Sequence, residues 1–373
     1  MTDNTPSRKE WKDLYQKAAE FRKFKPWEWM WDDEMFAVRN PETGEVAYCT
    51  VMGRMGEFFG MAAYLGREGL ETFLQIQSDE ILPYGEESLY LQRLLLVSFE
   101  DREDIEDEDY QIIRKLGLRF RGKNGWPQFR SLRPHYMPWY LEKDEAQFLT
   151  LVLEQTALIC KALKKDPENI THPDGKIFIR IPEKTAEGLE WKDGWIDPED
   201  DEEIGSFIPG EEVDPLIASL PDMKELLKLK KEGVWEVDFY YYPEPVQEEP
   251  DERPYFPATI TWADHESGEM IEVELAEPSQ WKSFFMETFH NAVEKTQHLP
   301  GIIQYEDEEL LPLLESLTSS LNIKLEEVFE LEVLGEAWEG FREFAADDNS
   351  VLGVMGRLMG DDSIIKTGNG YGR

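Results

Sequence analysis

One stretch of this sequence carries residue types that could bind an anion. The 32 residues between Asp109 and Glu142 contain no Asp or Glu, although these acids make up 79 of the 373 residues. Its seven basic residues are Arg114, Lys115, Arg119, Arg121, Lys123, Arg130 and Arg133, interleaved with Phe120, Trp126, Phe129, His135, Tyr136, Trp139 and Tyr140. A planar guanidinium matches phosphate or carboxylate, and a flat ring beside it can stack, so the stretch predicts a ligand-binding or docking segment.

The predicted ligand-binding residues are Arg119, Arg121, Arg130, Arg133, Trp126 and Trp139. Two interpretations stay open for them. In one, the arginines line a pocket for an anion or nucleotide. In the other, they pair with the protein's own acids, first of all those of residues 197–214, where nine acids occur without a Lys or Arg, or with a sister molecule.

These residues support two hypotheses of function. The first is a non-catalytic binding or regulatory protein that uses the basic segment as a docking site for a protein partner or a small anionic ligand. The alternative is an enzyme acting on a phosphate- or carboxylate-bearing small molecule, with Arg130 and Arg133 as a clamp and His135 or Tyr136 as proton donor. We favour the first, because the sequence shows no catalytic constellation.

Familiar catalytic and metal-binding motifs do not occur. There is no P-loop, nucleophile elbow, HExxH, Cys-x-x-Cys or EF-hand loop, and the five histidines lack metal-ligand spacing. The acids of residues 100–109 offer oxygen ligands for a divalent ion, but they fall where a helix should begin, and acids in a first helical turn stabilise the helix dipole. We therefore expect neither a metal nor a cofactor.

Composition bounds the class of protein. A net charge of −40 disfavours nucleic acid and anionic lipid as partners, while 12 Trp, 14 Tyr and 20 Phe indicate a folded chain. No run is long and apolar enough for a transmembrane helix, and the first ten residues lack the apolar core of a signal peptide. Two cysteines suit a reducing compartment, so we expect a cytoplasmic protein. The oligomeric state is not predicted.

Hydrophobic periodicity and turn residues predict an α+β fold with two related β-β-α-β-α-β halves. The first half comprises strands at 35–38 and 46–52, a helix at 57–77, a strand at 94–99, a helix at 104–116 and a strand at 118–121. The second comprises strands at 258–262 and 270–275, a helix at 278–298, a strand at 301–305, a helix ending at 320 and a strand at 322–325. Both hairpin loops carry Glu-(Thr/Ser)-Gly-Glu, which suggests an internal repeat.

Composition shifts divide the chain into four parts. We expect an N-terminal α+β domain at 1–182, an acidic linker with one or two strands at 183–253, a C-terminal α+β domain at 254–346 and a flexible tail at 347–373. Between the two halves, the pattern predicts a helix at 143–164 and strands at 176–181 and 234–242.

Two sequence segments in the first half carry a family resemblance. Trp-Glu-Trp-Met-Trp-Asp-Asp-Glu at 27–34, with the hairpin after it, and Gly-Trp-Pro-Gln-Phe-Arg-Ser-Leu-Arg-Pro-His-Tyr-Met-Pro-Trp-Tyr at 125–140 resemble an uncharacterised bacterial family of acidic cytoplasmic proteins. Residues 300–344 resemble a second domain of unknown function that accompanies it. The resemblance implies a two-domain α+β protein and no assigned activity. Some members carry a SEC-C zinc motif, which this chain lacks.

Overall fold

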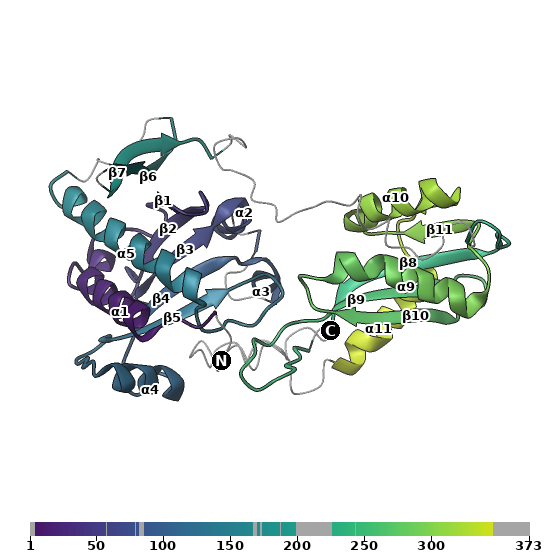
Figure 1. Ribbon diagram of the computed structural model, residues 1–373, viewed down its shortest axis with the longest axis horizontal. Coiled ribbons are helices and arrows are strands. Elements are labelled where there is room, and N and C mark those ends of the chain that lie inside the picture. Colours follow the sequence, from purple (N-terminus) through teal and green to yellow (C-terminus); the bar gives the residue numbers. More distant parts are fainter. Residues whose placement is uncertain are drawn as a thin grey trace, which may run out of the picture. The chain divides into compact units, whose positions relative to one another are not determined.

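The computed structural model describes residues 4–56, 58–78, 80–81, 86–166, 170–171, 174–186, 188–198, 226–242 and 244–345 (Figure 1). The chain divides into two compact units. The first comprises Met1–Pro134 and Pro138–Phe207, and the second comprises His135–Met137 and Ile208–Arg373. The acidic run beyond residue 198 and the predicted tail at 347–373 lie outside the described residues.

A seven-stranded sheet forms the centre of the first unit. Its strand order is β5-β4-β3-β2-β1-β6-β7, and neighbours are antiparallel except for β1 and β6, which are parallel. The strands are β1 (Phe36–Arg39), β2 (Val46–Met52), β3 (Gly60–Leu65), β4 (Leu94–Glu100), β5 (Trp126–Leu132), β6 (Ile177–Thr185) and β7 (Gly188–Ile196).

Helices cover both faces of this sheet. They are α1 (Arg8–Arg22), a 3₁₀ turn η1 (Pro26–Glu28), α2 (Gly66–Gln77), α3 (Glu86–Leu91), α4 (Asp107–Leu116) and α5 (Lys143–Leu163). The apolar stripes of α1 and α5 pack on one face with Phe36, Cys49 and Val97, and α2 packs on the other with Tyr48 and Leu94. Burial of these faces, rather than helix propensity alone, stabilises the helices.

Helix α5 is the one described helix that is long and apolar enough to cross a membrane. However, 61% of the most apolar 18-residue segment of this helix is buried within the protein. Leu149, Val152 and Leu153 on this helix are fully buried in the core that it shares with α1. These are the properties of a core helix, which passes the same test of length and composition.

The second unit contains a five-stranded sheet in the order β10-β9-β8-β11-β12. Its elements are β8 (Val234–Tyr241), β9 (Ala258–Asp264), β10 (Met270–Ala276), α9 (Trp281–Thr296), β11 (Ile302–Tyr305), a 3₁₀ turn η2 (Glu308–Leu310), α10 (Leu311–Leu321), β12 (Lys324–Glu327) and α11 (Glu332–Ala345). Helices α9 and α10 pack on one face around Trp235 and Trp262. Helix α11 follows β12 and contacts β8 and β9.

The structure confirms an α+β fold in two halves and corrects two element predictions. The helix predicted from residue 57 begins only at Gly66, because residues 60–65 form β3, a fully buried central strand whose continuous apolar run has no alternation. The strand predicted at 118–121 is wrong, and the strand lies at β5 instead. Its Pro127 is tolerated because β5 is the edge of the sheet.

The two hairpin loops have equivalent hydrogen bonds. The amide of Asn40 donates to the carbonyl of Glu45, and that of Asp264 donates to the carbonyl of Glu269. In each loop the glycine has positive φ, at 82° for Gly44 and 72° for Gly268, where a side chain would be strained. The shared motif therefore encodes the same turn. The strand orders of the two sheets differ, and the relation between the halves stays a prediction.

A fully buried carboxylate anchors α11 to the second sheet. Glu236 on β8 accepts hydrogen bonds from the amides of Val333 and Leu334, both at 3.0 Å, in the first turn of α11. Its other oxygen lies 2.6 Å from Nδ1 of His265. This hydrogen bond raises the pKa of His265 above its ordinary value. Glu236 thus joins β8, the end of β9 and the start of α11.

We predict that Glu236→Ala lowers the free energy of unfolding of the second unit by about 2–4 kcal/mol, because two helix amides and the ring of His265 lose a buried acceptor. Urea denaturation measures this loss. The pKa of His265, followed by NMR titration, should fall toward its ordinary value in the same variant. Glu236→Gln keeps an acceptor and should lose less stability; equal losses in both variants would contradict the prediction.

The carboxyl group of Asp238 on β8 should make the stability of the second unit depend on pH. Burial raises the pKa of its carboxyl from 3.8 to about 6, with smaller contributions from Glu306, Asp307 and Glu236. Because the folded pKa lies above the unfolded one, the native state binds more protons, and stability is lost as pH rises through the folded pKa. Between about pH 5 and about pH 7 the free energy of unfolding should fall by about 1 kcal/mol more in the wild type than in Asp238→Asn. Urea midpoints at both pH values test this, and parallel profiles would contradict it.

Candidate functional site

The basic residues of the acid-free stretch separate into two sets. Arg130 on β5 and Arg133 just after it make ion pairs with carboxylates of the first unit. The other five are exposed, and we call them the basic surface: Arg114 and Lys115 on the last turn of α4, and Arg119, Arg121 and Lys123 on the loop to β5. The predicted ligand-binding arginines are therefore divided between an internal and an external environment.

Arg130 is enclosed by two carboxylates and a ring. Its Nη2 lies 2.7 Å from Oδ2 of Asp109 and 2.6 Å from Oε2 of Glu106, and the Tyr140 ring centroid is 4.7 Å from its guanidinium carbon. Asp109 is only 2% exposed. Burial opposes the charge of Arg130, but the attraction and hydrogen bonds of Asp109 and Glu106 raise its pKa above the ordinary value. This group ties α4 to the edge strand.

Arg133 has a similar internal role at the start of α5. Its Nη2 lies 2.8 Å from Oε2 of Glu142 and 2.9 Å from Oε1 of Glu145. Glu145 also accepts hydrogen bonds from the Ser131 hydroxyl at 2.6 Å and from the Glu142 amide at 2.8 Å, which completes the capping box of α5. Arg130 and Arg133 thus pair with acids of their own unit, as the second interpretation holds. The partner acids are those at 106, 109, 142 and 145, however, and not the acids of residues 197–214 that were expected first.

The two predicted stacking residues also pack internally. Trp126 is half-buried, with its ring centroid 5.8 Å from that of Tyr110 and 6.1 Å from that of Phe120. Trp139 exchanges two backbone hydrogen bonds with Ser131, and its ring meets that of Tyr140 edge-on at 5.5 Å. The Trp126 ring packs against the core of the first unit, whereas the described ring contact of Trp139 is with its chain neighbour.

His135 and Tyr136, the predicted proton donors, belong to the second unit. The His135 ring stacks on Tyr241 of β8 with centroids 3.3 Å apart, and burial lowers the pKa of this histidine to about 3. It is therefore neutral at physiological pH and has no acidic proton to donate. The Tyr136 hydroxyl donates to Glu277 at 2.8 Å, and burial raises its pKa to about 12. The backbone of His135 accepts from Phe256, so this segment pairs like a short strand.

The basic surface makes no salt bridge with any residue that the structure describes. Sequence reasoning found all five of its residues, but placed only Arg119 and Arg121 among the binding residues. The absence of acids between residues 109 and 142 marks these five residues together with Arg130 and Arg133, and it does not separate the two sets.

Hydrogen bonds fix the backbone of the loop that carries the basic surface. Arg22 of α1 donates to the carbonyls of Asn124 at 2.5 Å and Lys123 at 2.9 Å, and the Asn124 amide donates to Asp101 at 2.6 Å. A Cβ on Gly125 would lie 2.5 Å from the carbonyl oxygen of Arg121, so the chain closes tightly here. The loop presents its cations from a defined backbone, which lowers the entropy cost of binding.

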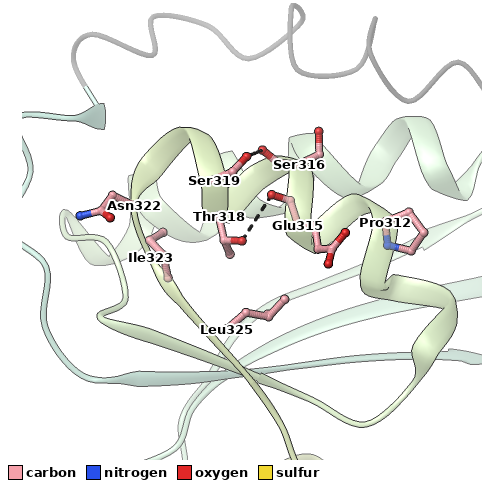
Figure 2. Close-up of a pocket in the computed structure, with 8 residues that line it drawn as sticks. All are labelled: Pro312, Glu315, Ser316, Thr318, Ser319, Asn322, Ile323 and Leu325. Carbon is pink, nitrogen blue, oxygen red and sulfur yellow. Dashed lines mark hydrogen bonds between the residues drawn. The ribbon is translucent and has the colours of Figure 1, made fainter.

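Three cavities lie elsewhere in the described parts of the chain. A shallow groove of about 780 Å³ between α10 and β12 is lined by Pro312, Glu315, Ser316, Thr318, Ser319, Asn322, Ile323 and Leu325 (Figure 2). The hydroxyls of Thr318 and Ser319 donate to carbonyls of their own helix. Smaller cavities of about 330 and 260 Å³ in the first unit share Glu34. None of these three is lined by a predicted site residue.

No metal centre is formed within the described ranges, since no group of three or more His, Cys, Asp or Glu side chains is placed to hold an ion. Cys49 and Cys160 are both buried free thiols, and burial raises their pKa values above the ordinary range. A raised pKa keeps a thiol protonated and unreactive.

Two family models match successive regions of the chain. Residues 11–180 match a family model described as Domain of unknown function (DUF7309). Residues 222–342 match another, described as Domain of unknown function (DUF6930). No curated protein matches the chain. The expected resemblance to two domains of unknown function is thus confirmed, and neither description carries an activity.

Substitutions in the two sets of arginines should change stability by very different amounts. Arg130→Ala leaves Asp109 buried without its cation and should lower the free energy of unfolding of the first unit by about 3–5 kcal/mol. Arg121→Ala removes an exposed side chain and should change it by less than about 0.5 kcal/mol. Urea denaturation distinguishes these values. A wild-type stability for Arg130→Ala would show that its ion pairs do not support the fold.

Proposed function

We propose that this protein is a non-catalytic binding protein that docks an anionic partner on the basic surface. One observation carries the proposal. Five exposed cations lie within ten residues, on a helix end and a fixed loop, and pair with no described acid of a chain that has 40 excess negative charges. In such a chain an unneutralised cationic surface attracts acidic groups of another molecule.

Binding is better supported than catalysis because of how the remaining arginines are used. The enzyme alternative requires the heads of Arg130 and Arg133 to clamp a substrate. Both heads are engaged by carboxylates of their own unit. Releasing Arg130 would leave the buried Asp109 without its cation, and releasing Arg133 would remove the ion pairs of Glu142 and Glu145. The neutral His135 also lacks the proton that this alternative assigns to it.

The charge distribution indicates what kind of anion fits. Exposed ion pairs contribute about 0.2–1 kcal/mol each, so several must form together for measurable affinity. A long polyanion would extend beyond the basic surface into the negative field of the rest of the chain, which repels it. A short acidic segment of a protein matches the basic surface better than an extended nucleic acid does.

The test is fluorescence anisotropy of a labelled ten-residue polyglutamate peptide, with a ten-nucleotide oligothymidine as the comparison probe. We predict that the peptide binds, that added salt weakens it, and that Arg119→Glu with Arg121→Glu weakens it by at least about tenfold, because two attractions become repulsions.

The matched control is Lys184→Glu with Lys192→Glu. These exposed lysines pair with Glu42 and Glu183 in the same unit, so the net charge changes equally away from the basic surface. The control should bind like the wild type. Equal weakening in both variants, or no peptide binding by the wild type, would overturn the proposal. Tighter binding of the oligothymidine would overturn the assignment to acidic protein segments.

A further inference from the structure

The exposed face of α4 carries charges of both signs, separated along the helix. Asp107, Glu108, Gln111, Arg114 and Lys115 are all exposed, whereas Asp109 and Ile113 on the opposite side are buried. The acids occupy the first turn and the bases the last. The helix dipole explains the sign at each end. It does not explain why these residues form no salt bridge with any described part of the chain.

Their spacing explains it. Asp107 and Arg114 are seven residues apart, as are Glu108 and Lys115, which places each acid and base on one helix face but about 10 Å apart along the axis. Intrahelical ion pairs need a spacing of three or four residues. Between them, at that spacing from both groups, lies Gln111, which is uncharged. The face is therefore unable to neutralise itself within one helix.

The same spacing makes the face complementary to itself. Residue 111 is the midpoint between positions 107 and 115 and between 108 and 114. Two such helices can lie antiparallel across a two-fold axis that passes through this residue. Each acidic pair then faces the basic pair of the other copy. The two Gln111 side chains meet at the axis, where each amide can donate a hydrogen bond to the other and accept one from it. Helix α4 lies at the margin of the first unit, beside the edge strand β5 (Figure 1).

We propose that the outer face of α4 binds the same face of a second copy of this chain, in antiparallel register centred on Gln111. The inference rests on the proposed docking function, because Arg114 and Lys115 belong to the basic surface. It names the acidic segment that this surface takes: the first turn of α4 in the other molecule. Ion pairs at exposed positions give a weak contact. At about 0.15 M salt the Debye length is ~8 Å, so the repulsion between distant negative charges of the two copies is screened more than the attraction within the facing pairs.

Charge-reversed variants test the pairing by sedimentation velocity over a range of protein concentrations at that salt. The wild type should self-associate. Asp107→Lys with Glu108→Lys makes the face wholly basic, and Arg114→Glu with Lys115→Glu makes it wholly acidic, so each variant alone should be monomeric. An equimolar mixture should associate, because all facing charges are then opposite. Self-association of either variant alone at the wild-type level would overturn the proposal.

Disulfide trapping tests the register independently, and Gln111→Cys keeps every charge of the helix. Both native cysteines are buried. With diamide as oxidant, Gln111→Cys on the two-fold axis should form a cross-linked dimer that thiols reverse. Asp107→Cys, on the same face but off the axis, should form at least about tenfold less. Equal cross-linking of both, or none at Gln111→Cys, would overturn the antiparallel contact.

Failure of this inference is distinguishable from failure of the proposed function. Asp107→Lys with Glu108→Lys leaves the basic surface intact, so it should retain polyglutamate binding while losing self-association. Peptide binding without wild-type self-association overturns the second-copy contact alone. Self-association with no peptide binding overturns the general docking function alone.

Discussion

A carboxylate that leaves water must be met by a cation or by amide hydrogens, and this chain has about twice as many carboxylates as cations. That constraint determines where its arginines lie. Asp109 and Glu145 take up Arg130 and Arg133, and Glu236 is satisfied by two helix amides and His265. Each of these contacts joins separate elements: α4 to β5, β5 to α5, and β8 to α11. These buried and half-buried acids thus hold helices to strands within each unit.

Against this background the exposed cations of α4 and its loop differ in how closely they gather. Some exposed lysines, such as Lys184 and Lys192, face an acid of their own unit, and other exposed cations, such as Arg8 and Lys12, make no described ion pair but are not gathered into such a group. The loop backbone is held by Arg22 and Asp101, so its cations are presented from a fixed frame. A cationic surface held in a fixed frame is the physical basis of the docking role that we propose, whereas catalysis requires convergent groups around a reacting atom.

Local signals in the sequence were sufficient for much of the fold. The hairpin loops, β4, α5 and most of α4 follow from turn residues and periodicity, because those features act over a few residues. Strand β3 was missed because a strand buried on both faces has no period to detect. In the candidate site, the absence of acids marked the right stretch. It was not possible to tell the paired arginines from the exposed ones, because Arg130 finds its acid 21 residues away and Arg133 finds one 12 residues away, through tertiary contacts.

The assignment of His135–Met137 to the second unit affects how the two units could be expressed or recombined separately. These residues lie inside the stretch that matches DUF7309, yet their backbone pairs with residues 254–256. If the gene were divided anywhere between the two matched regions, the N-terminal product would carry His135–Met137. The C-terminal product would lack this segment, which pairs with residues 254–256. Shuffling of the two halves in evolution, or their separate expression, therefore has to overcome an interleaved connectivity that the boundaries of the family matches do not reveal.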